Sequence, residues 1–171
     1  MYLSAGHSNV DPGACANNRR EADIVEDFRN MVSHYLTAAG IKHSVDATGT
    51  NNLPLADTVK QLKGHNIALE FHCNAGPESA GGVETLSAAK DMALACELCD
   101  VISRTLQIKN RGAKPEDSGQ HHRLAFVQAG GIIVELFFIS SKSDLAAYDA
   151  RKWLAAKAVA SVLASRVGVQ L

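Results

Sequence analysis

Apolar positions recur along this chain with two different periods. Between about residues 19 and 39 they are spaced by three or four residues, and Gly40 follows directly. This spacing predicts a long amphipathic helix with one buried face, and the glycine predicts where the helix ends. The same period predicts three further helices, the last in one or two pieces, at residues 55–62, 90–106 and 143–166.

Shorter apolar segments, bounded by glycine, proline and asparagine, predict β-strands. Because these segments alternate with the helices, the chain is expected to form an α/β fold with right-handed crossovers. We expect a twisted sheet of about six strands, mostly parallel or mixed, with helices on both faces in three layers. The predicted strands are residues 2–5, 41–45, 67–72, 83–87, 123–127 and 132–137.

The composition is that of a globular domain. The chain has 171 residues, of which 46% are hydrophobic and 20% are charged, and it contains no low-complexity stretch. A chain of this length buries about 70% of its unfolded surface, so it can fold without a metal or a disulfide. We therefore expect a single domain over residues 1–171, in which a bound metal serves function rather than folding.

Charge and apolar runs exclude several classes of partner. The net charge of −1, from 17 Lys and Arg against 18 Asp and Glu, argues against a nucleic-acid binder. The longest apolar run, residues 132–139, is short and contains Glu135, so no membrane span is expected. The first residues lack the features of a secretion signal, which predicts synthesis in the cytoplasm. Nothing in the sequence indicates an oligomeric state.

Four cysteines, Cys15, Cys73, Cys96 and Cys99, fit reduced thiols better than a disulfide framework in a chain of this size. Cys96 and Cys99 form a C-x-x-C pair, but they fall inside a predicted helix rather than at its start. Buried small side chains are therefore favoured over a redox or zinc-binding pair. Cys73 should point away from His72, because neighbours on a strand face opposite sides.

Polar residues follow or interrupt three of the predicted strands. His7 comes after the first strand, His72 ends the third, and Glu135 lies inside the last. In such sheets functional groups gather at the carboxyl ends of the strands. Each histidine also has an ordinary interpretation, which is a solvated loop side chain for His7 and a hydrogen-bonded core side chain for His72.

Glu135 is the strongest exception to the hydrophobic pattern, because the segment IIVELFFI surrounds its carboxylate with apolar residues. Burial of an unpaired charge is costly, so this group needs a partner or a shifted pKa. A structural ion pair would satisfy the requirement. A cleft that holds a cation and a reacting water would satisfy it too, and a raised pKa suits a general acid or base.

Glu21 lies on the apolar stripe of the first predicted helix, together with Ile24 and Phe28. This places a carboxylate on the core-facing side of the first turn. Two interpretations stay open: a capping interaction with Asn18, in an N-x-x-E arrangement, and a metal ligand. Two histidines and a carboxylate on separate elements can form a catalytic zinc site, with a further carboxylate for proton transfer.

The order of several short segments resembles a known family. These segments are GHSNVDPGA, NNRREAD, LEFHCNAG, GGVETLS, NRGAK and IIVELFFISSKSD. They resemble the zinc-dependent N-acetylmuramoyl-L-alanine amidases of the Amidase_3 type over nearly the whole chain. NRGAK and VELFFISSKSD are similar to the catalytic domains of clostridial phage endolysins. Such enzymes cleave the amide between the lactyl group of N-acetylmuramic acid and the L-alanine of the stem peptide in peptidoglycan.

The resemblance implies roles for four residues already singled out. His7, Glu21 and His72 match the zinc ligands, with one Zn²⁺ per chain, and Glu135 matches the catalytic carboxylate. It also implies peptidoglycan as the substrate of a phage endolysin for host cell lysis, held in the host cytoplasm before release to the cell wall. Two alternatives stay open: a zinc peptidase that cuts within the stem peptide, and a non-catalytic module that binds peptidoglycan.

Some positions depart from the family's pattern or lack a counterpart in it. The family more often has a small or apolar residue at Glu70, a proline at residues 129–131, and Gly-Phe where this chain has Phe-Phe after Glu135 and Leu136. Arg111 and His122 are candidate contacts to the substrate, since a guanidinium suits a substrate carboxylate and the histidine could meet the glycan or the peptide. The alternatives are a structural ion pair for Arg111 and a surface loop for His122.

Overall fold

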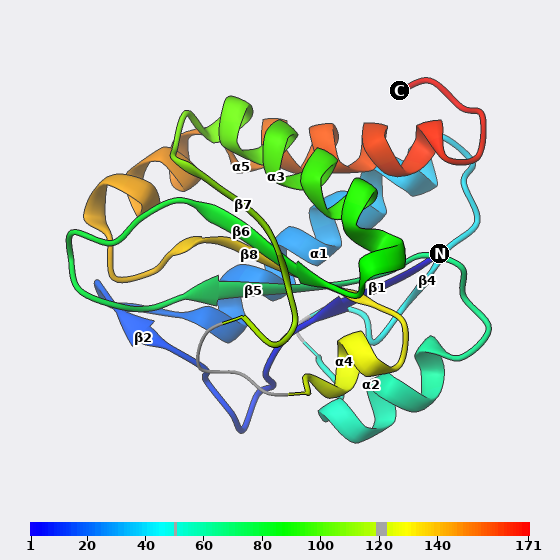
Figure 1. Ribbon diagram of the computed structural model, residues 1–171, viewed down its shortest axis with the longest axis horizontal. Coiled ribbons are helices and arrows are strands. Elements are labelled where there is room, and N and C mark those ends of the chain that lie inside the picture. The colour runs from blue at the N-terminus through cyan, green and yellow to red at the C-terminus, as the bar shows by residue number, and fades with distance from the viewer. Residues whose placement is uncertain (50, 119–122) are drawn as a thin grey trace.

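A mixed sheet forms the centre of the computed structural model, which describes residues 1–49, 51–118 and 123–171 (Figure 1). Its strands are β1 (Tyr2–Ala5), β4 (Ser44–Val45), β5 (Ala68–Asn74), β6 (Val83–Ser87), β7 (Asn110–Pro115) and β8 (Ile132–Phe138). They lie side by side in the order β4-β1-β5-β8-β6-β7. The first four run parallel, whereas β6 is antiparallel to β8 and parallel to β7. The predicted α/β fold with a six-stranded sheet is confirmed, and the sheet is mixed.

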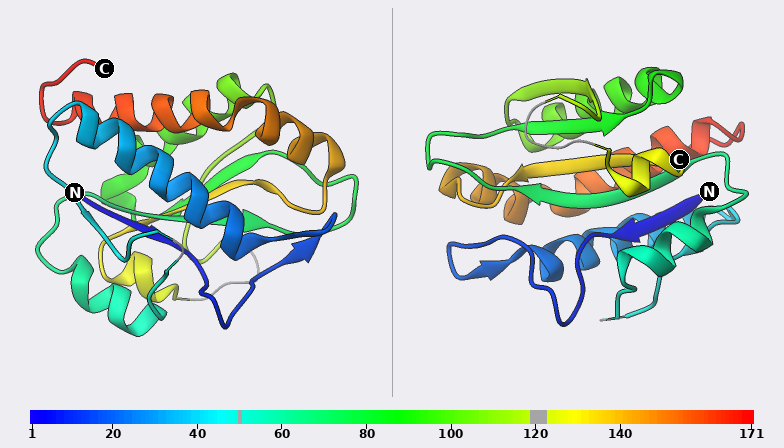
Figure 2. Two further views of the ribbon diagram at one scale, coloured as in Figure 1. Left: turned by 180° about the vertical axis from the view of Figure 1, so that it is seen from behind. Right: turned by 60° about the horizontal axis from the view of Figure 1, so that its bottom comes forward.

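Helices cover both faces of this sheet, as predicted. The long helices lie over one face and the short ones over the other (Figures 1 and 2). The long helices are α1 (Glu21–Ala38), α3 (Met92–Leu106) and α5 (Lys142–Ser165). The short helices are α2 (Leu55–Leu62) and α4 (Ala125–Gln128). The two faces are therefore covered unequally, and α2 and α4 shield only part of theirs.

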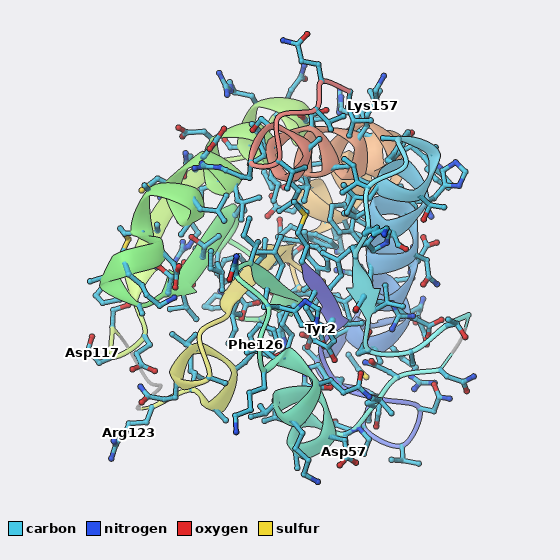
Figure 3. The ribbon with its side chains drawn as sticks, turned by 90° about the vertical axis from the view of Figure 1, so that its right-hand side faces the viewer. Tyr2, Asp57, Asp117, Arg123, Phe126 and Lys157 are labelled. Atoms are coloured by element: carbon cyan, nitrogen blue, oxygen red, sulfur yellow. The ribbon has the colours of Figure 1, made fainter. Side chains whose placement is uncertain are left out.

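Alternate side chains of each strand point to opposite faces of the sheet. Leu3 packs in the larger core cluster under α1, α3 and α5, whereas Tyr2 packs in the smaller cluster beside α2 and α4. Tyr2 and Phe126 of α4, both labelled in Figure 3, belong to this smaller cluster. In β5 and β8, the side chains on the same face of the sheet as this smaller cluster include His72 and Glu135. The polar residues of these strands therefore lie on the thinly covered face.

The strand predicted at residues 123–127 is wrong, because Ala125–Gln128 forms the short helix α4. This single turn buries two consecutive apolar side chains, Phe126 and Val127. A Cβ atom at Gly131 would lie only 2.1 Å from the Phe126 ring, so the chain folds back over that ring just before β8. An apolar run this short does not show the periodicity by which a helix and a strand can be told apart.

Two β-structures were not predicted from the sequence. One is β7, an edge strand that contains glycine, proline and charged residues and buries none of its side chains. The other is a small antiparallel ribbon of β2 (Cys15–Ala16) and β3 (Arg19–Arg20), which precedes α1. No residue of these strands is fully buried, so neither element leaves a strong hydrophobic pattern in the sequence.

Several predicted boundaries shift in the structure. The first long helix begins at Glu21 rather than near residue 19, because the preceding two residues pair in the β2–β3 ribbon. The strand predicted at residues 41–45 shrinks to β4. The last helix is one piece, α5. In the described part of the chain, no helix is both long and apolar enough to cross a membrane.

All four cysteines are free thiols, as predicted. Cys73 is buried in the larger core cluster, on the side of β5 away from His72. Cys99 is buried as well, against Thr85 of β6. Cys96 is exposed on α3, so the prediction that both members of the C-x-x-C pair are buried is half wrong.

Candidate metal centre and catalytic carboxylate

Parallel strands bring the predicted site residues to one edge of the sheet. His7 follows the carboxyl end of β1, and His72 lies near the carboxyl end of the neighbouring strand β5. Glu135 of β8 pairs in register with His72, so these two side chains lie next to each other. Glu21 is the first residue of α1, whose start reaches this edge. The three residues expected at strand ends, His7, His72 and Glu135, therefore lie together at this edge, and Glu21 joins them from α1.

The loop after β1 is held in a strained conformation that carries His7 into the site. His7 has a φ of 65°, in the left-handed region that side chains other than glycine rarely adopt. The Asn52 side-chain amide donates to the carbonyls of Ala5, Gly6 and His7 at 2.6, 3.1 and 2.6 Å. A Cβ atom at Gly6 would lie 2.2 Å from the His72 ring. Glycine is therefore required where this loop crosses His72.

Glu21 joins the two histidines. Its Oε1 lies 3.1 Å from His7 Nε2 and 3.0 Å from His72 Nδ1. The same carboxylate accepts hydrogen bonds from the backbone N–H groups of Cys73 and Ala14, at 2.9 and 2.8 Å. These four contacts fix both carboxylate oxygens in the site, so the side chain has one defined orientation.

The capping interpretation of Glu21 is wrong. The N-cap of α1 is Arg20 rather than Asn18. Within the described residues, the Arg20 side chain makes no capping hydrogen bond. Asn18 has a φ of 58° in the turn of the β2–β3 ribbon. The Glu21 carboxylate instead points back toward β5, which leaves the metal-ligand interpretation.

The triad of His7, Glu21 and His72 has the donor set of a zinc site. One ligand atom from each residue lies within 4.8 Å of the other two. Two imidazole nitrogens and one carboxylate oxygen are ligands that Zn²⁺ takes in catalytic sites, where a further position stays open to water. The residues present therefore fit the metal that the family resemblance implies.

The carboxylates around the two imidazoles favour the protonated forms of His7 and His72. Burial alone would raise the pKa of Glu21, but hydrogen bonds from His7 and His72 hold it well below its ordinary value. The pKa of His7 is raised, chiefly by its hydrogen bond to Glu21. Burial would lower the pKa of His72, and the hydrogen bonds to Glu21 and Glu70 raise it instead. A cation bound by the triad displaces these protons, so its affinity is expected to fall at low pH.

Glu135 lies beside the triad and carries a buried, unpartnered oxygen. Among the described residues, its Oε2 has no hydrogen-bond partner. The residue as a whole keeps partial exposure, toward a cavity of about 260 Å³ that His7, Glu21 and His72 also line. Burial raises its pKa to about 7, although the nearby His72 lowers it. A carboxyl group that titrates near neutral pH suits proton transfer.

The raised pKa predicts how Glu135 affects stability in metal-free protein. A carboxyl group that binds its proton more tightly when folded destabilises the fold as pH rises from about 4.5 to about 7. The shift corresponds to roughly 3 kcal/mol at most. Glu135→Gln should therefore unfold like wild type at pH 4 and be more stable at pH 8, in urea unfolding with a chelator present. Equal stability of both proteins at pH 8 would mean that Glu135 is not held in a costly environment.

Arg111 forms the structural ion pair that was its alternative interpretation. Its Nε donates to Glu84 Oε2 at 2.5 Å, and its guanidinium lies over the Phe138 ring at 4.8 Å from the ring centre. Lys114 binds the same Glu84 oxygen at 2.6 Å. A contact between Arg111 and the substrate stays a prediction. His122, the other candidate, lies outside the described residues.

One residue in contact with the site was singled out only as a departure from the family. Glu70 is buried on β5, and its Oε1 lies 3.1 Å from His72 Nε2. The spacing of two residues along a strand was the available signal, because it places Glu70 and His72 on the same face. A second hollow, of about 400 Å³, lies on this side of the histidines and is lined by apolar residues of the loops, including Val10 and Leu53.

Comparisons with known proteins identify relatives of this chain and solved structures with the same fold. The chain is 41% identical to a Neisseria meningitidis protein assigned as an N-acetylmuramoyl-L-alanine amidase. Their structures align with a TM-score of 0.92 over 99% of this chain and 97% of that one. The catalytic domain of the CD27L endolysin, which targets Clostridia difficile, shares the fold, with a TM-score of 0.72, 20% identity and coverage of 99% and 97%.

Curated relatives are longer proteins. The N-acetylmuramoyl-L-alanine amidase LytC of Bacillus subtilis is 24% identical over 152 residues, which are 84% of this chain and 30% of LytC. The chain spans about a third of the length of the curated relatives that it matches. Residues 1–165 match the family model described as Amidase_3, N-acetylmuramoyl-L-alanine amidase. This match covers nearly the whole chain, which therefore belongs to the Amidase_3 family of N-acetylmuramoyl-L-alanine amidases.

Proposed function

We propose that this chain is a zinc-dependent N-acetylmuramoyl-L-alanine amidase, which hydrolyses the amide between the lactyl group of muramic acid and L-alanine in peptidoglycan. The observation that carries the proposal is the triad of His7, Glu21 and His72, with the unpartnered Oε2 of Glu135 beside it. Membership of the Amidase_3 family supports the choice of bond. Residues 1–171 act as one catalytic domain in this proposal.

One Zn²⁺ per chain would be held by His7, Glu21 and His72, whose atoms Nε2, Oε1 and Nδ1 face one another. The chemistry that zinc supplies when bound is a lowered pKa of water and a polarised amide carbonyl. Glu21 is itself fixed by the N–H groups of Cys73 and Ala14, so the ligand geometry is set before a metal arrives.

Glu135 moves the proton in the proposed reaction. Its carboxylate removes a proton from the attacking water and donates it to the departing alanine nitrogen, because an amide nitrogen leaves poorly without one. Its position in register with His72 places the carboxylate at the cavity that the triad lines. Leu86, Leu124 and Ile133 line the same cavity and limit the water around the carboxylate.

The products released from purified peptidoglycan test the proposal. An amidase releases intact stem peptides that begin with a free L-alanine amino group and leaves the glycan strands unbroken. We expect mass spectrometry to show these peptides with zinc-loaded protein and not with chelated protein. Peptide residues left on the muramic acid would favour the zinc peptidase instead, and binding without any released product would favour a non-catalytic module.

We propose, as a finer function, that the enzyme acts as a phage endolysin in host cell lysis. This proposal rests on the resemblance of NRGAK and VELFFISSKSD to clostridial endolysin domains. It predicts that the protein accumulates in the host cytoplasm and that purified protein lowers the turbidity of cells whose walls are exposed. An amidase that acts on isolated peptidoglycan but lyses no cells under these conditions would contradict the lytic role and leave the reaction intact.

A further inference from the structure

Glu70 faces the ring nitrogen of His72 that the proposed metal does not use. Glu70 precedes His72 by two residues on β5, so both side chains lie on the same face of the sheet. The Glu70 Oε1 is 3.1 Å from His72 Nε2, while His72 Nδ1 lies 3.0 Å from Glu21 Oε1. The imidazole is therefore placed between two carboxylates, one at each nitrogen.

A metal-binding imidazole must keep the lone pair of one nitrogen free. In neutral histidine the proton sits on one of the two nitrogens, and a hydrogen-bond acceptor at that nitrogen decides which one. An acceptor at Nε2 holds the proton there and leaves the Nδ1 lone pair directed at the triad. The Glu70 carboxylate is such an acceptor. The triad that satisfies the metal-site geometry contains Glu21 and His72 without Glu70.

A buried hydrogen-bond network holds the other oxygen of the Glu70 carboxylate, the one that does not face His72. Its Oε2 accepts a hydrogen bond from Ser4 Oγ at 3.2 Å, and Ser4 is fully buried on β1. Asp46 Oδ2 lies 3.4 Å from the same hydroxyl and accepts from the Ala5 N–H. Asp46 is bound in turn by Arg29 at 2.7 Å, an ion pair in which both side chains are 0% exposed. The network fixes Glu70 against the strand that leads into the His7 loop.

We propose that Glu70 is a positioning residue, which holds the proton of His72 on Nε2 and so keeps Nδ1 ready for the metal. The inference rests on the proposed function, because it assumes that His72 is a zinc ligand. This role belongs to a buried carboxylate at a position where the Amidase_3 family more often has a small or apolar residue.

Zinc affinity of the full-length protein, measured by competition with a chromophoric chelator, tests this role. Glu70→Ala should weaken zinc binding by about 10- to 100-fold, the loss typical of removing such a hydrogen-bond partner. Glu70→Gln keeps an oxygen that accepts from Nε2–H, so it should recover a large part of the affinity. Glu84→Gln is the matched control, since it removes another buried carboxylate that contacts Arg111 and Lys114 and should bind zinc like wild type.

The position of the His72 proton gives a second measurement, which does not depend on activity. In chelated protein at alkaline pH, the ¹⁵N chemical shifts of the ring report how the proton is shared between Nδ1 and Nε2. We expect Glu70→Ala to move the proton toward Nδ1, which faces Glu21, and Glu70→Gln to keep more of it on Nε2. If Glu70→Ala does not fold, the ring shifts of Glu70→Gln carry the test, and a proton found mainly on Nδ1 although the Gln oxygen is present would overturn the role.

The outcomes separate this role from the proposed function. Zinc binding by Glu70→Ala at wild-type strength, an equal loss in Glu84→Gln, or an unchanged His72 proton in both Glu70 variants would each overturn the role of Glu70 while the zinc site stands. A wild-type protein that binds no zinc would overturn the proposed function itself.

Discussion

Glu135→Gln is expected to lose most of the amidase activity while it keeps its zinc. Glutamine has nearly the same shape as glutamate, but it can neither take a proton from water nor return one to the leaving nitrogen. The loss expected for general acid–base catalysis alone is roughly 10²–10⁴-fold in kcat. Release of stem peptide from purified peptidoglycan, measured at equal zinc content, gives the comparison with wild type.

The retained zinc is what makes this substitution informative. Glu135 is not a member of the ligand triad, so its replacement leaves all three proposed ligands in place. The variant should also still bind insoluble peptidoglycan, measured by co-sedimentation. Full activity of Glu135→Gln would contradict the proton-transfer role. Loss of zinc together with activity would instead place Glu135 among the groups that bind the metal.

Replacement of a ligand is expected to remove zinc and activity together. His72→Ala removes one of the three donor atoms, and Glu21→Gln replaces the charged carboxylate by a neutral amide, which is a much weaker zinc ligand. Elemental analysis should therefore find wild type with about one equivalent of zinc and both variants depleted. Zinc at 100 times its Kd should stabilise the wild type by about 2.7 kcal/mol and shift its Tm upward. The two variants should show little of that shift.

The fold should survive these changes, because the apolar core does not depend on the metal. The larger core cluster lies under α1, α3 and α5 and contains none of the three triad residues. Chelated wild type and both ligand variants should therefore keep the helical circular dichroism signal. Unfolding on chelation would make the metal structural, and full zinc content in His72→Ala would make the ligand assignment wrong.

The parts of the fold that could be predicted are those with strong hydrophobic periods. β1, β8 and α1 combine an apolar pattern with clear end signals, and their existence was predicted from the sequence. β7 was not, because an edge strand buries few side chains and so carries no alternation. Helix α4 was taken for a strand, because an apolar run of one turn fits either structure.

The candidate site, like the fold, could be predicted from the sequence only in part. Glu135 stood out because a carboxylate in an apolar strand breaks the pattern, and the structure gives it a buried oxygen without a partner among the described residues. Glu21 remained ambiguous, since the first turn of a helix suits capping and metal binding equally well. The contact that decides it, with His72 on β5, joins residues far apart in the sequence. No local pattern encodes such a contact.

Isotope labelling of a purified soluble muropeptide tests the central claim most directly. When the reaction is run in H₂¹⁸O with zinc-loaded protein, hydrolysis of the amide to L-alanine must place the new oxygen in the lactyl carboxylate of muramic acid. Tandem mass spectrometry should find the label there, with unlabelled stem peptide, and Glu135→Gln should form this product roughly 10²–10⁴-fold more slowly. Label in a carboxyl group of the stem peptide, or labelled product from Glu135→Gln at the wild-type rate, would contradict the proposed reaction.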